Sequence, residues 1–430
     1  MTADSACYLD EIVNAQKRGE PRGITSICSA HPVVLEAVFQ HAQKHQTVVL
    51  IESTCNQVNQ FGGYTGMTPF DFVAYIGDMA DRLDFPSEGL ILGGDHLGPS
   101  VWQHEPAESA MAKSFQLIQD YVAAGYSKIH LDASMKLGDD PAGRLRTETS
   151  ARRAAEMAKV AEQAFMESWG EFAPRYVIGT EVPIPGGAQE VEEHLQVTNV
   201  QDARQTIETT RRAFYDLGLQ AAWERVIALV VQPGVEYGDD FVIDYQRELS
   251  KELSGFIEEQ PLVYEAHSTE YQLPNALQQM VEDHFAILKV GPALTFAFRE
   301  AVFALAMTEN ELYPKTERSN LIEILDQAML TQPGYWEKYY SGDADAQAVA
   351  RKYSFSDRSR YYWPDNDVQT ALNALFVNFG DKAIPLTLLS QYLPVQFEKI
   401  RAGLIRNDSL AIIQDKLFSQ LDIYDAAVNP

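Results

Sequence analysis

The feature that most constrains the fold is a regular alternation of eight short apolar runs with segments whose apolar residues follow helical spacing. The runs lack the polar alternation of a half-exposed strand, so they predict strands buried on both faces. They occupy residues 23–30, 47–54, 90–96, 128–134, 176–182, 225–234, 262–268 and 285–292. Eight strand–helix units between residues 23 and 312 predict an α/β fold of the (β/α)8 TIM-barrel type, which usually takes about 250 residues plus insertions.

A doubly wound sheet is the alternative fold, but no Gly-x-Gly-x-x-Gly motif follows the first run. A helix over about residues 6–18 is expected to cover the floor of the barrel. Residues 311–430 show helical patterns without a further strand–helix repeat and without a low-complexity linker before them. We therefore expect residues 1–310 to form the barrel with its N-terminal capping helix, and residues 311–430 to form a helical C-terminal extension packed on the barrel.

Charge and composition narrow the range of partners. The sequence has 34 Lys and Arg against 61 Asp and Glu, a formal net charge of -27. Such a chain repels phosphate backbones and anionic lipids, so neither nucleic acid nor a membrane is expected as a partner. Three cysteines without a spacing pattern predict no disulfide framework. With no charged-then-apolar leader and no apolar run of about 18 residues, we expect a soluble cytoplasmic protein.

Polar side chains stand at the ends of the predicted strands, which is where a barrel of this type places its catalytic groups. The third run ends in Asp95-His96 with glycines nearby. A carboxylate at the edge of a core must be paired or put to use. The other strand-end candidates are Ser29, His31, Glu52, Asn56, Gln57, His130, Asp132, Glu181, Gln232, Glu236, Glu265, His267 and Lys289.

Two of the strand-end imidazoles suggest a metal site. His96, His267 and a carboxylate such as Glu181 form a ligand set for a divalent cation that leaves positions open for a substrate. A strand-end histidine is alternatively a hydrogen-bonded structural residue. The adjacent Asp95 favours the site interpretation for His96, whereas His130 suits the core and the site equally.

Two other segments allow two interpretations each. Arg358 and Arg360 lie in an aromatic and basic segment, 353–364, and either reach an anionic substrate or form a solvated face. The glycine-rich segment 61–66 either cradles a phosphate or simply turns tightly. No Gly-x-x-x-x-Gly-Lys-Ser/Thr motif is present, so nothing indicates a kinase.

Eight segments carry a resemblance to a known family. They are 52–69 (ESTCNQVNQFGGYTGMTP), 93–103 (GGDHLGPSVWQ), 128–135 (KIHLDASM), 179–187 (GTEVPIPGG), 230–237 (VVQPGVEY), 264–272 (YEAHSTEYQ), 287–301 (ILKVGPALTFAFREA) and 356–364 (SDRSRYYWP). Together they resemble the Z-type subunits of tagatose-1,6-bisphosphate aldolase over nearly the whole chain. Those proteins are related to the class II, metal-dependent fructose-bisphosphate aldolases. The resemblance therefore implies a (β/α)8 barrel and a divalent metal ion, with Zn, Mn, Co and Ni all open.

The resemblance also implies roles for single residues. Asp95 matches the acid/base of the wider superfamily, and His96 and His267 match two zinc-binding histidines. Glu181 corresponds to the strand-end glutamate near the metal. Contacts with the substrate are expected from strand-end residues and from the basic segment, namely Ser29, Asn56, Gln232, Lys289 and Arg358.

The sequence departs from the superfamily pattern at two places. The sixth predicted strand ends in Gln232-Pro-Gly, where the aldolases have a third zinc-binding histidine. Ser268-Thr269-Glu270 replaces the glycine-rich phosphate loop that follows the second histidine. Because an acidic residue opposes a phosphate dianion, this difference puts cleavage of a bisphosphate by the usual route in doubt.

Together with the strand-end residues, the resemblance implies a metal-dependent carbohydrate enzyme. It would act on a ketohexose, tagatose or fructose or a phosphate of either, by retro-aldol chemistry at the C3–C4 bond. The enzyme would be a 4-epimerase or a tagatose-bisphosphate aldolase, with Asp95 or Asp132 taking the proton of the C4 hydroxyl. Members of the family have also been regarded as non-catalytic partners. The alternative is therefore a subunit that stabilises the separate catalytic subunit of a two-component aldolase.

Overall fold

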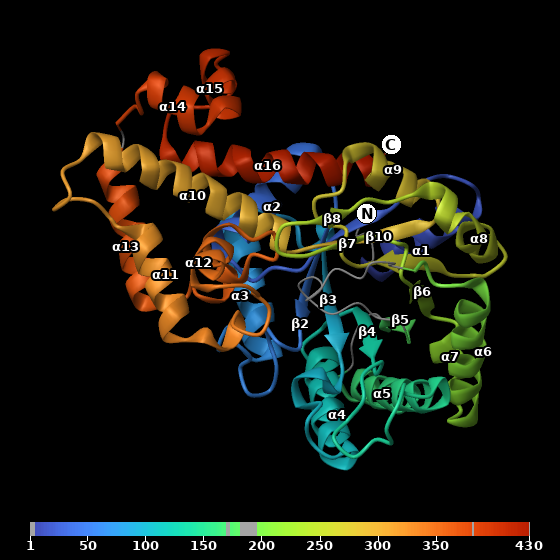
Figure 1. The fold of residues 1–430 in the computed structure, drawn as a ribbon. Helices are drawn as coiled ribbons and strands as arrows, with labels where there is room; N and C mark the ends of the chain where they lie inside the picture. Colours follow the sequence, from blue (N-terminus) through green and yellow to red (C-terminus); the bar gives the residue numbers. More distant parts are fainter. Residues whose placement is uncertain (1–4, 169–172, 181–195, 381, 430) are drawn as a thin grey trace.

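The computed structural model describes residues 5–168, 173–180, 196–380 and 382–429. Its centre is a closed barrel of eight parallel strands, which confirms the predicted fold class (Figure 1). The strands are β1 (Ile24–Ile27), β2 (Val49–Thr54), β3 (Leu90–Leu97), β4 (Lys128–Asp132), β5 (Arg175–Gly179), β6 (Val226–Val230), β9 (Val263–Ala266) and β10 (Phe285–Val290). They pair in this order, and β10 pairs back to β1.

Helices follow the strands and cover the outside of the barrel. They are α2 (Pro32–His45), α3 (Pro69–Arg82), α4 (Ala107–Ala123), α5 (Thr147–Ser168), α6 (Val200–Asp216), α7 (Gln220–Trp223), α8 (Arg247–Glu258), α9 (Pro274–Glu282) and α10 (Pro292–Leu312). The start of α3 follows from its sequence, because Thr68 and Asp71 form a reciprocal capping box around Pro69. The sequence pattern did not indicate α8 or the hairpin of β7 (Glu236–Tyr237) and β8 (Val242–Ile243).

The inward face of the barrel changes from apolar to charged along the strands. At the floor, an apolar cluster joins the strands to Leu9 and Ile12 of α1 (Ser5–Lys17). Its strand members include Ile24, Leu50, Ile91, Val177, Val263 and Ile287. Two positions further along their strands, on the same face, lie the buried charges of Glu52, Glu265 and Lys289. Because α1 closes the apolar end, the polar interior can open only at the carboxyl ends of the strands.

The C-terminal part of the chain is a helical extension (Figure 1). Its helices are α11 (Leu321–Thr331), α12 (Ala344–Tyr353), α13 (Asn366–Phe379), α14 (Leu386–Tyr392), α15 (Pro394–Arg401) and α16 (Ser409–Val428). The last of them returns to the barrel, where it packs against α2, α9, α10 and β1. The carbonyl oxygen of Val428 accepts a hydrogen bond from the backbone nitrogen of Gly23 at 2.9 Å, so the end of α16 is fastened to the start of β1.

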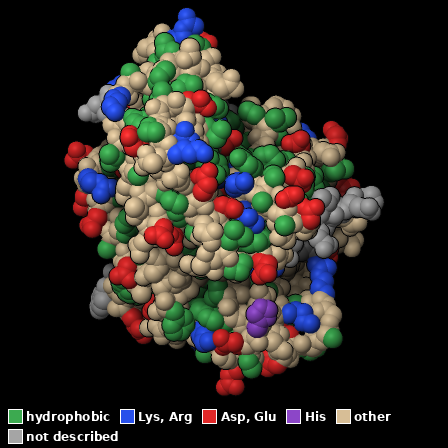
Figure 2. Space-filling view, turned by 60° about the vertical axis from the view of Figure 1, so that its left-hand side comes forward, with side chains coloured by type: hydrophobic (Ala, Val, Ile, Leu, Met, Phe, Trp, Pro, Cys, Tyr) green, Lys and Arg blue, Asp and Glu red, His purple; other side chains and the backbone are tan. Residues whose placement is uncertain are grey.

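The surface carries both signs of charge. Figure 2 shows acidic and basic side chains interspersed over one face, among scattered hydrophobic groups. In the part of the chain that the structure describes, no helix combines the length and the apolar character needed to cross a membrane.

Candidate active site

The Asp95-His96 pair lies at the end of β3 in an irregular stretch of backbone. The pairing of β3 with β4 changes register between Gly94 and Leu97, and His96 has a left-handed backbone with a φ of 46°. Neighbouring side chains of a regular strand face opposite sides. Here the irregularity lets Asp95 and His96 line the same pocket. A positive φ at a histidine costs conformational energy, and such residues cluster at functional sites.

Two glycines around this pair make room for the site. A Cβ at Gly93 would lie 2.7 Å from the Cγ atom of Glu52. A Cβ at Gly98 would lie 1.8 Å from the carbonyl oxygen of Asp132. The glycines therefore allow the buried Glu52 side chain and the backbone of β4 to approach β3 closely.

Asp132, at the end of β4, orients the ring of His96. The Nδ1 atom of His96 donates a hydrogen bond to Oδ2 of Asp132 at 2.9 Å. The other carboxylate oxygen accepts from the backbone nitrogen of Ser134 at 3.1 Å and from its hydroxyl at 2.6 Å. Burial lowers the pKa of His96, but the charge of Asp95 and the bond to Asp132 outweigh burial and raise it above its ordinary value. When the ring is neutral, the bond to Asp132 keeps its proton on Nδ1 and leaves Nε2 free, 3.9 Å from Oδ1 of Asp95.

Three imidazole rings meet in the barrel. The ring centroids of His96 and His267 lie 4.7 Å apart, and that of His130 lies 5.2 Å and 5.3 Å from them. The Nε2 atom of His267 donates to Oε1 of Glu265 at 3.0 Å. Burial lowers the pKa of His267 to about 3 despite this bond, so the ring is neutral at physiological pH. The Nδ1 atom of His130 lies 3.2 Å from Oδ1 of Asp95, so His130 belongs to the site.

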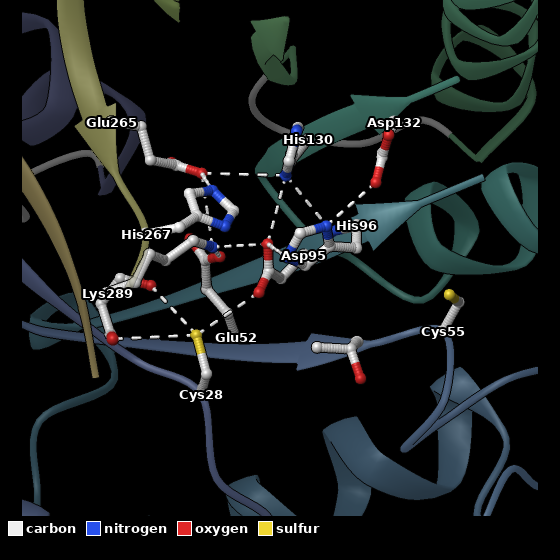
Figure 3. Close-up of polar contacts among 12 residues, drawn as sticks. Cys28, Glu52, Cys55, Asp95, His96, His130, Asp132, Glu265, His267 and Lys289 are labelled. Atoms are coloured by element: carbon white, nitrogen blue, oxygen red, sulfur yellow. Dashed lines mark hydrogen bonds and ion pairs between the residues drawn. The ribbon is translucent and has the colours of Figure 1, made fainter. Parts of the chain in front are cut away.

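Two buried lysines bind the carboxylates of this region. The Nζ atom of Lys128 lies 2.5 Å from Oε1 of Glu52 and 2.5 Å from Oε2 of Glu265. Lys289 also pairs with Glu52, and its Nζ lies 2.7 Å from Oδ1 of Asp95 and 3.4 Å from Oε1 of Glu265. Figure 3 shows the side chain of Lys289 reaching in among these acids. We call the following residues the barrel cluster: Glu52, Asp95, His96, Lys128, His130, Asp132, Glu265, His267 and Lys289.

These contacts determine the charge states of Asp95 and Lys289. Burial raises the pKa of Asp95, but the charges of His96 and Lys289 hold it well below its ordinary range. Burial likewise lowers the pKa of Lys289, and the surrounding carboxylates, Asp95 first, hold it well above its ordinary value. Asp95 is therefore an anion and Lys289 a cation at neutral pH.

A pocket opens above the barrel cluster, and its space free of protein atoms, including the mouth, is about 620 Å3. Besides members of the cluster it is lined by Cys28, Thr54, Asn56, Gln57, Tyr64, Tyr237, Ser268, Glu270, Val290, Gly291, Pro292, Arg360 and Tyr361. Arg360 and Tyr361 come from the short helix η4 (Arg358–Tyr361) of the extension. The Tyr361 ring meets the Tyr64 ring edge-on with centroids 4.8 Å apart. The C-terminal extension thus supplies part of the pocket wall.

The pocket brings together half of the predicted site residues. Asp95, His96 and His267 line it, as do the predicted substrate contacts Asn56 and Lys289. Asp132 holds the His96 ring by its hydrogen bond to Nδ1 and does not line the pocket. Glu181, predicted as a ligand and catalytic residue, lies outside the described residues.

Three predicted substrate contacts have other partners. Ser29 accepts a hydrogen bond from the backbone of His31 at 3.3 Å. The side-chain oxygen of Gln232 accepts from two backbone nitrogens of its own turn, at 2.7 Å and 3.1 Å. The guanidinium of Arg358 lies 3.0 Å from the ring centroid of Tyr339, outside the pocket lining. Of the two arginines in the basic segment, Arg360 is the one in the pocket wall.

A candidate metal-binding group lies within the barrel cluster. One potential ligand atom from each of Asp95, His130, Glu265 and His267 falls within 4.8 Å of the others. Two imidazoles and two carboxylates are a usual donor set for Zn²⁺ and similar cations. These residues therefore fit a divalent ion, although the ammonium of Lys289 competes with it for two of the carboxylates.

Several pocket residues were not found from the sequence. Cys28 lies with its Sγ 3.6 Å from Oδ2 of Asp95, and burial raises the pKa of the thiol. The sequence contained a signal for Cys28. Side chains along a strand alternate between its two faces, and Cys28 lies four residues after the inward-facing Ile24, so it is expected on the same face. Tyr64 and Tyr237 lie outside the barrel strands, where no periodic pattern marks them.

Fold and pocket together define a (β/α)8-barrel protein with a site of imidazoles, carboxylates and a lysine at the carboxyl ends of its strands. The family model described as D-tagatose-1,6-bisphosphate aldolase subunit GatZ/KbaZ-like matches residues 9–429. The chain belongs to this family, as the resemblance implied. Membership supports a function of the tagatose-bisphosphate aldolase type, either as a lyase-type enzyme or as a subunit of one.

One solved structure supports the fold over 94% of the chain. A probable tagatose 6-phosphate kinase from Sinorhizobium meliloti 1021 is 44% identical, with a TM-score of 0.87, over 94% of this chain and 100% of that chain. The YdjI aldolase from Escherichia coli K12 is 16% identical, with a TM-score of 0.44, over 73% and 89% of the two chains. The fructose-bisphosphate aldolase Fba from Campylobacter jejuni is 12% identical, with a TM-score of 0.46, over 86% and 91%. The last two scores are too low to support an argument.

Proposed function

We propose that this protein is a metal-dependent enzyme that breaks and re-forms the C3–C4 bond of a ketohexose, as a tagatose/fructose 4-epimerase or as a tagatose-bisphosphate aldolase. The observation that carries the proposal is the convergence of Asp95, His267 and Lys289 on one pocket. An anionic proton acceptor, a neutral imidazole and a fixed cation there lie within reach of one small molecule.

The proposed metal ligands are drawn from the barrel cluster. His267 belongs both to the predicted set and to the candidate group with Asp95, His130 and Glu265. His96 and Glu181 remain predicted ligands. When bound, a divalent cation would polarise the C2 carbonyl and stabilise the negative charge left when the C3–C4 bond breaks.

Asp95 is the proposed proton carrier. Its carboxylate faces the pocket and takes the proton of the C4 hydroxyl. The electrons of the C3–C4 bond stay with C3, and C4 becomes an aldehyde carbon. If the aldehyde rotates and C3 attacks its other face, the proton returns from Asp95 to the C4 oxygen and the configuration at C4 is inverted. If the aldehyde leaves instead, the proton passes from Asp95 to C3 and the ketone fragment is released, which is the aldolase reaction.

The neighbours of Asp95 have supporting roles. Lys289 holds an ammonium beside Asp95, where it donates hydrogen bonds to a substrate oxygen that gains negative charge. Asp132 does not line the pocket and acts through His96, whose ring it orients, whereas Asp95 lines the pocket. The geometry therefore favours Asp95 over Asp132 as the base.

The charges of the pocket favour a substrate without phosphate. Among the lining residues the cations are Lys289 and Arg360, and Lys289 is already paired with Asp95. Two phosphate dianions would require additional cationic donors, which such a lining does not supply. Free tagatose and fructose are thus the preferred substrates, and Arg360 is the contact for a monophosphate.

The test uses chelator-treated protein supplied separately with Mn²⁺, Co²⁺, Ni²⁺ or Zn²⁺. Fructose, tagatose and their phosphates are followed by chromatography. We expect interconversion that depends on metal, and a loss of at least about 100-fold in kcat for Asp95→Asn, in line with the loss of a general base. Asp120→Asn, a surface change on α4, serves as the matched control and should retain activity. Absence of turnover with every metal, in protein that also binds none, would overturn the proposal.

The second candidate is a stabilising subunit of a two-component aldolase, favoured by membership in a family of aldolase subunits. In that case the isolated chain is inactive, and a catalytic aldolase subunit gains thermal stability when mixed with it. Activity of the isolated chain with metal would exclude a purely stabilising role.

A further inference from the structure

A second group of histidines and carboxylates lies on the outside of the barrel, between α2 and α16. His41 and His45 stand one turn apart on α2, and Asp422 and Asp425 stand one turn apart on α16. Residues spaced by three or four along a helix share one face. We call these four residues the helix cluster.

The distances within the helix cluster are short. The Nε2 atom of His41 lies 2.9 Å from Oδ1 of Asp422, and the Nε2 atom of His45 lies 3.8 Å from the same oxygen. The two rings stack with centroids 4.3 Å apart and planes 16° apart, so their nitrogen edges face the same carboxylate. One potential ligand atom from each of His41, His45 and Asp422 falls within 4.8 Å of the others.

Asp425 completes the arrangement from the other side of His45. Its Oδ2 lies 3.7 Å from Nδ1 of His45. A carboxylate near the second ring nitrogen of a metal-binding histidine favours the tautomer whose Nε2 is free, and Asp425 lies at ion-pair distance for this role. Pairs of histidines four residues apart on a helix are likewise a common zinc-binding arrangement.

We propose that the helix cluster binds one transition-metal cation of the Zn²⁺ type through His41, His45 and Asp422, and that the ion fastens the C-terminal helix to α2. The carboxylates carry two negative charges, and the ion pairs that the described residues form with them come from these histidines alone. A divalent cation neutralises that charge. Two imidazole nitrogens select Zn²⁺, Co²⁺ or Ni²⁺ over Mg²⁺, which prefers oxygen ligands.

The helix cluster is positioned so that a metal ion can reach it from solvent. The Asp422 side chain is 50% exposed and that of His45 33%, whereas the His41 side chain is only 6% exposed. An ion can therefore enter from the surface and reach a ligand that is already held in place.

The ion would stabilise helix α16, which contacts the segment that follows β9. The hydroxyl of Tyr424, on α16 between the two aspartates, donates to the carbonyl oxygen of Thr269 at 3.0 Å. Thr269 lies two residues beyond His267. Fastening α16 to α2 thus strengthens the contact between the C-terminal helix and the segment after β9.

The test titrates metal-free full-length protein with Zn²⁺ in a calorimeter and compares four proteins. Wild type is expected to bind one more equivalent of Zn²⁺ than His45→Ala, or to bind it at least ten-fold more tightly. Asp422→Asn should give the same loss, and because it is nearly isosteric and exposed it keeps the test valid if His45→Ala folds poorly. His104→Ala, which removes an exposed histidine elsewhere, should bind as wild type does.

The two metal sites are separated by a further variant. His267→Ala should remove Zn²⁺ binding in the barrel and leave Zn²⁺ binding at the helix cluster unchanged. Loss of binding at one site can therefore be distinguished from loss at the other. Zn²⁺ should also raise the melting temperature of wild type more than that of Asp422→Asn, while Mg²⁺ raises neither. Equal stoichiometry and equal affinity in wild type, His45→Ala and Asp422→Asn would overturn the proposal.

Discussion

In the barrel cluster Glu52, Asp95 and Glu265 are buried and each is paired with a lysine, whereas in the helix cluster the aspartates are partly exposed and lie against histidines. Both regions contain two or more imidazoles beside carboxylates. They differ in which positive charge balances the acids. Inside the barrel the chain supplies that charge itself, because charges left uncompensated in a buried place are costly. On the surface water screens the acids, so no lysine is needed.

This contrast in charge balance determines the role to which each region is suited. A site whose charges are fixed by the fold is preorganised, and it can act on a substrate without reorganising water. It is also a site in which an incoming metal must displace or accommodate Lys289. The helix cluster is less organised, and it leaves its ligands available to an ion.

Removal of Lys128 should have the largest effect on stability. Lys128→Met leaves Glu52 and Glu265 with one buried cation fewer, and breaking a buried ion pair costs about 3–5 kcal/mol of unfolding free energy. Urea unfolding measures the change. The matched control is Lys416→Met, since Lys416 forms a 3.0 Å ion pair with Glu300 and the two side chains are 30% and 44% exposed. That change should cost less than about 1 kcal/mol. Equal effects of the two variants would contradict the contrast between buried and exposed charge.

Glu270 provides an intermediate case, because it is buried at the pocket wall but pairs with no lysine among the described residues. Burial raises its pKa to about 7, while its Oε1 accepts a hydrogen bond from the backbone nitrogen of Gly291 at 3.1 Å. A carboxyl whose folded-state pKa is raised contributes stability that is present below about pH 4.5 and is lost as the pH rises through about 7.

Glu270→Gln keeps a side-chain oxygen that can accept the hydrogen bond from Gly291, and it removes the ionisable carboxyl group. Relative to wild type, the variant should therefore gain unfolding free energy as the pH increases from 4.5 to 8, by about 2–3 kcal/mol in total. Thermal and urea unfolding at several pH values measure the difference. Glu108→Gln, a change at an exposed position of α4, should show no such trend. A difference that stays constant with pH would show that Glu270 is not held in its neutral form.

The fold was predictable because its signals are periodic. Six of the eight barrel strands fall within the apolar runs, and β3 and β5 each extend one residue beyond theirs. The period of two along each strand carries the change from the apolar floor at Leu50 to the charge at Glu52. The hairpin of β7 and β8 was missed because two-residue strands are too short to show a period.

The site was predictable in part. Position at a strand end identified Asp95, His96, His267 and Lys289, and the structure brings them into one pocket. The ion pairs of Lys128 and Lys289 could not be foreseen, because they depend on the register between strands far apart in the sequence. The contribution of Arg360 depends on the path of the extension over the barrel mouth, which no local pattern encodes. The left-handed backbone at His96 was also hidden, because the motif alone does not show which face each residue takes.

Replacement of Lys289 tests the comparison most directly, because it makes the barrel cluster electrostatically similar to the helix cluster. Lys289→Met removes the ammonium that pairs with Asp95 and Glu265, two members of the candidate metal-binding group. Their carboxylates then lack a competing cation, so affinity for Co²⁺ in the barrel should rise about ten-fold, or about 1.4 kcal/mol. Lys289→Arg keeps the charge and should leave the affinity near that of wild type. Calorimetric titration with Co²⁺ measures both, and binding at the helix cluster should stay constant across all three proteins. Weaker binding in Lys289→Met would mean that the lysine holds the ligands in position for the ion and does not compete with it.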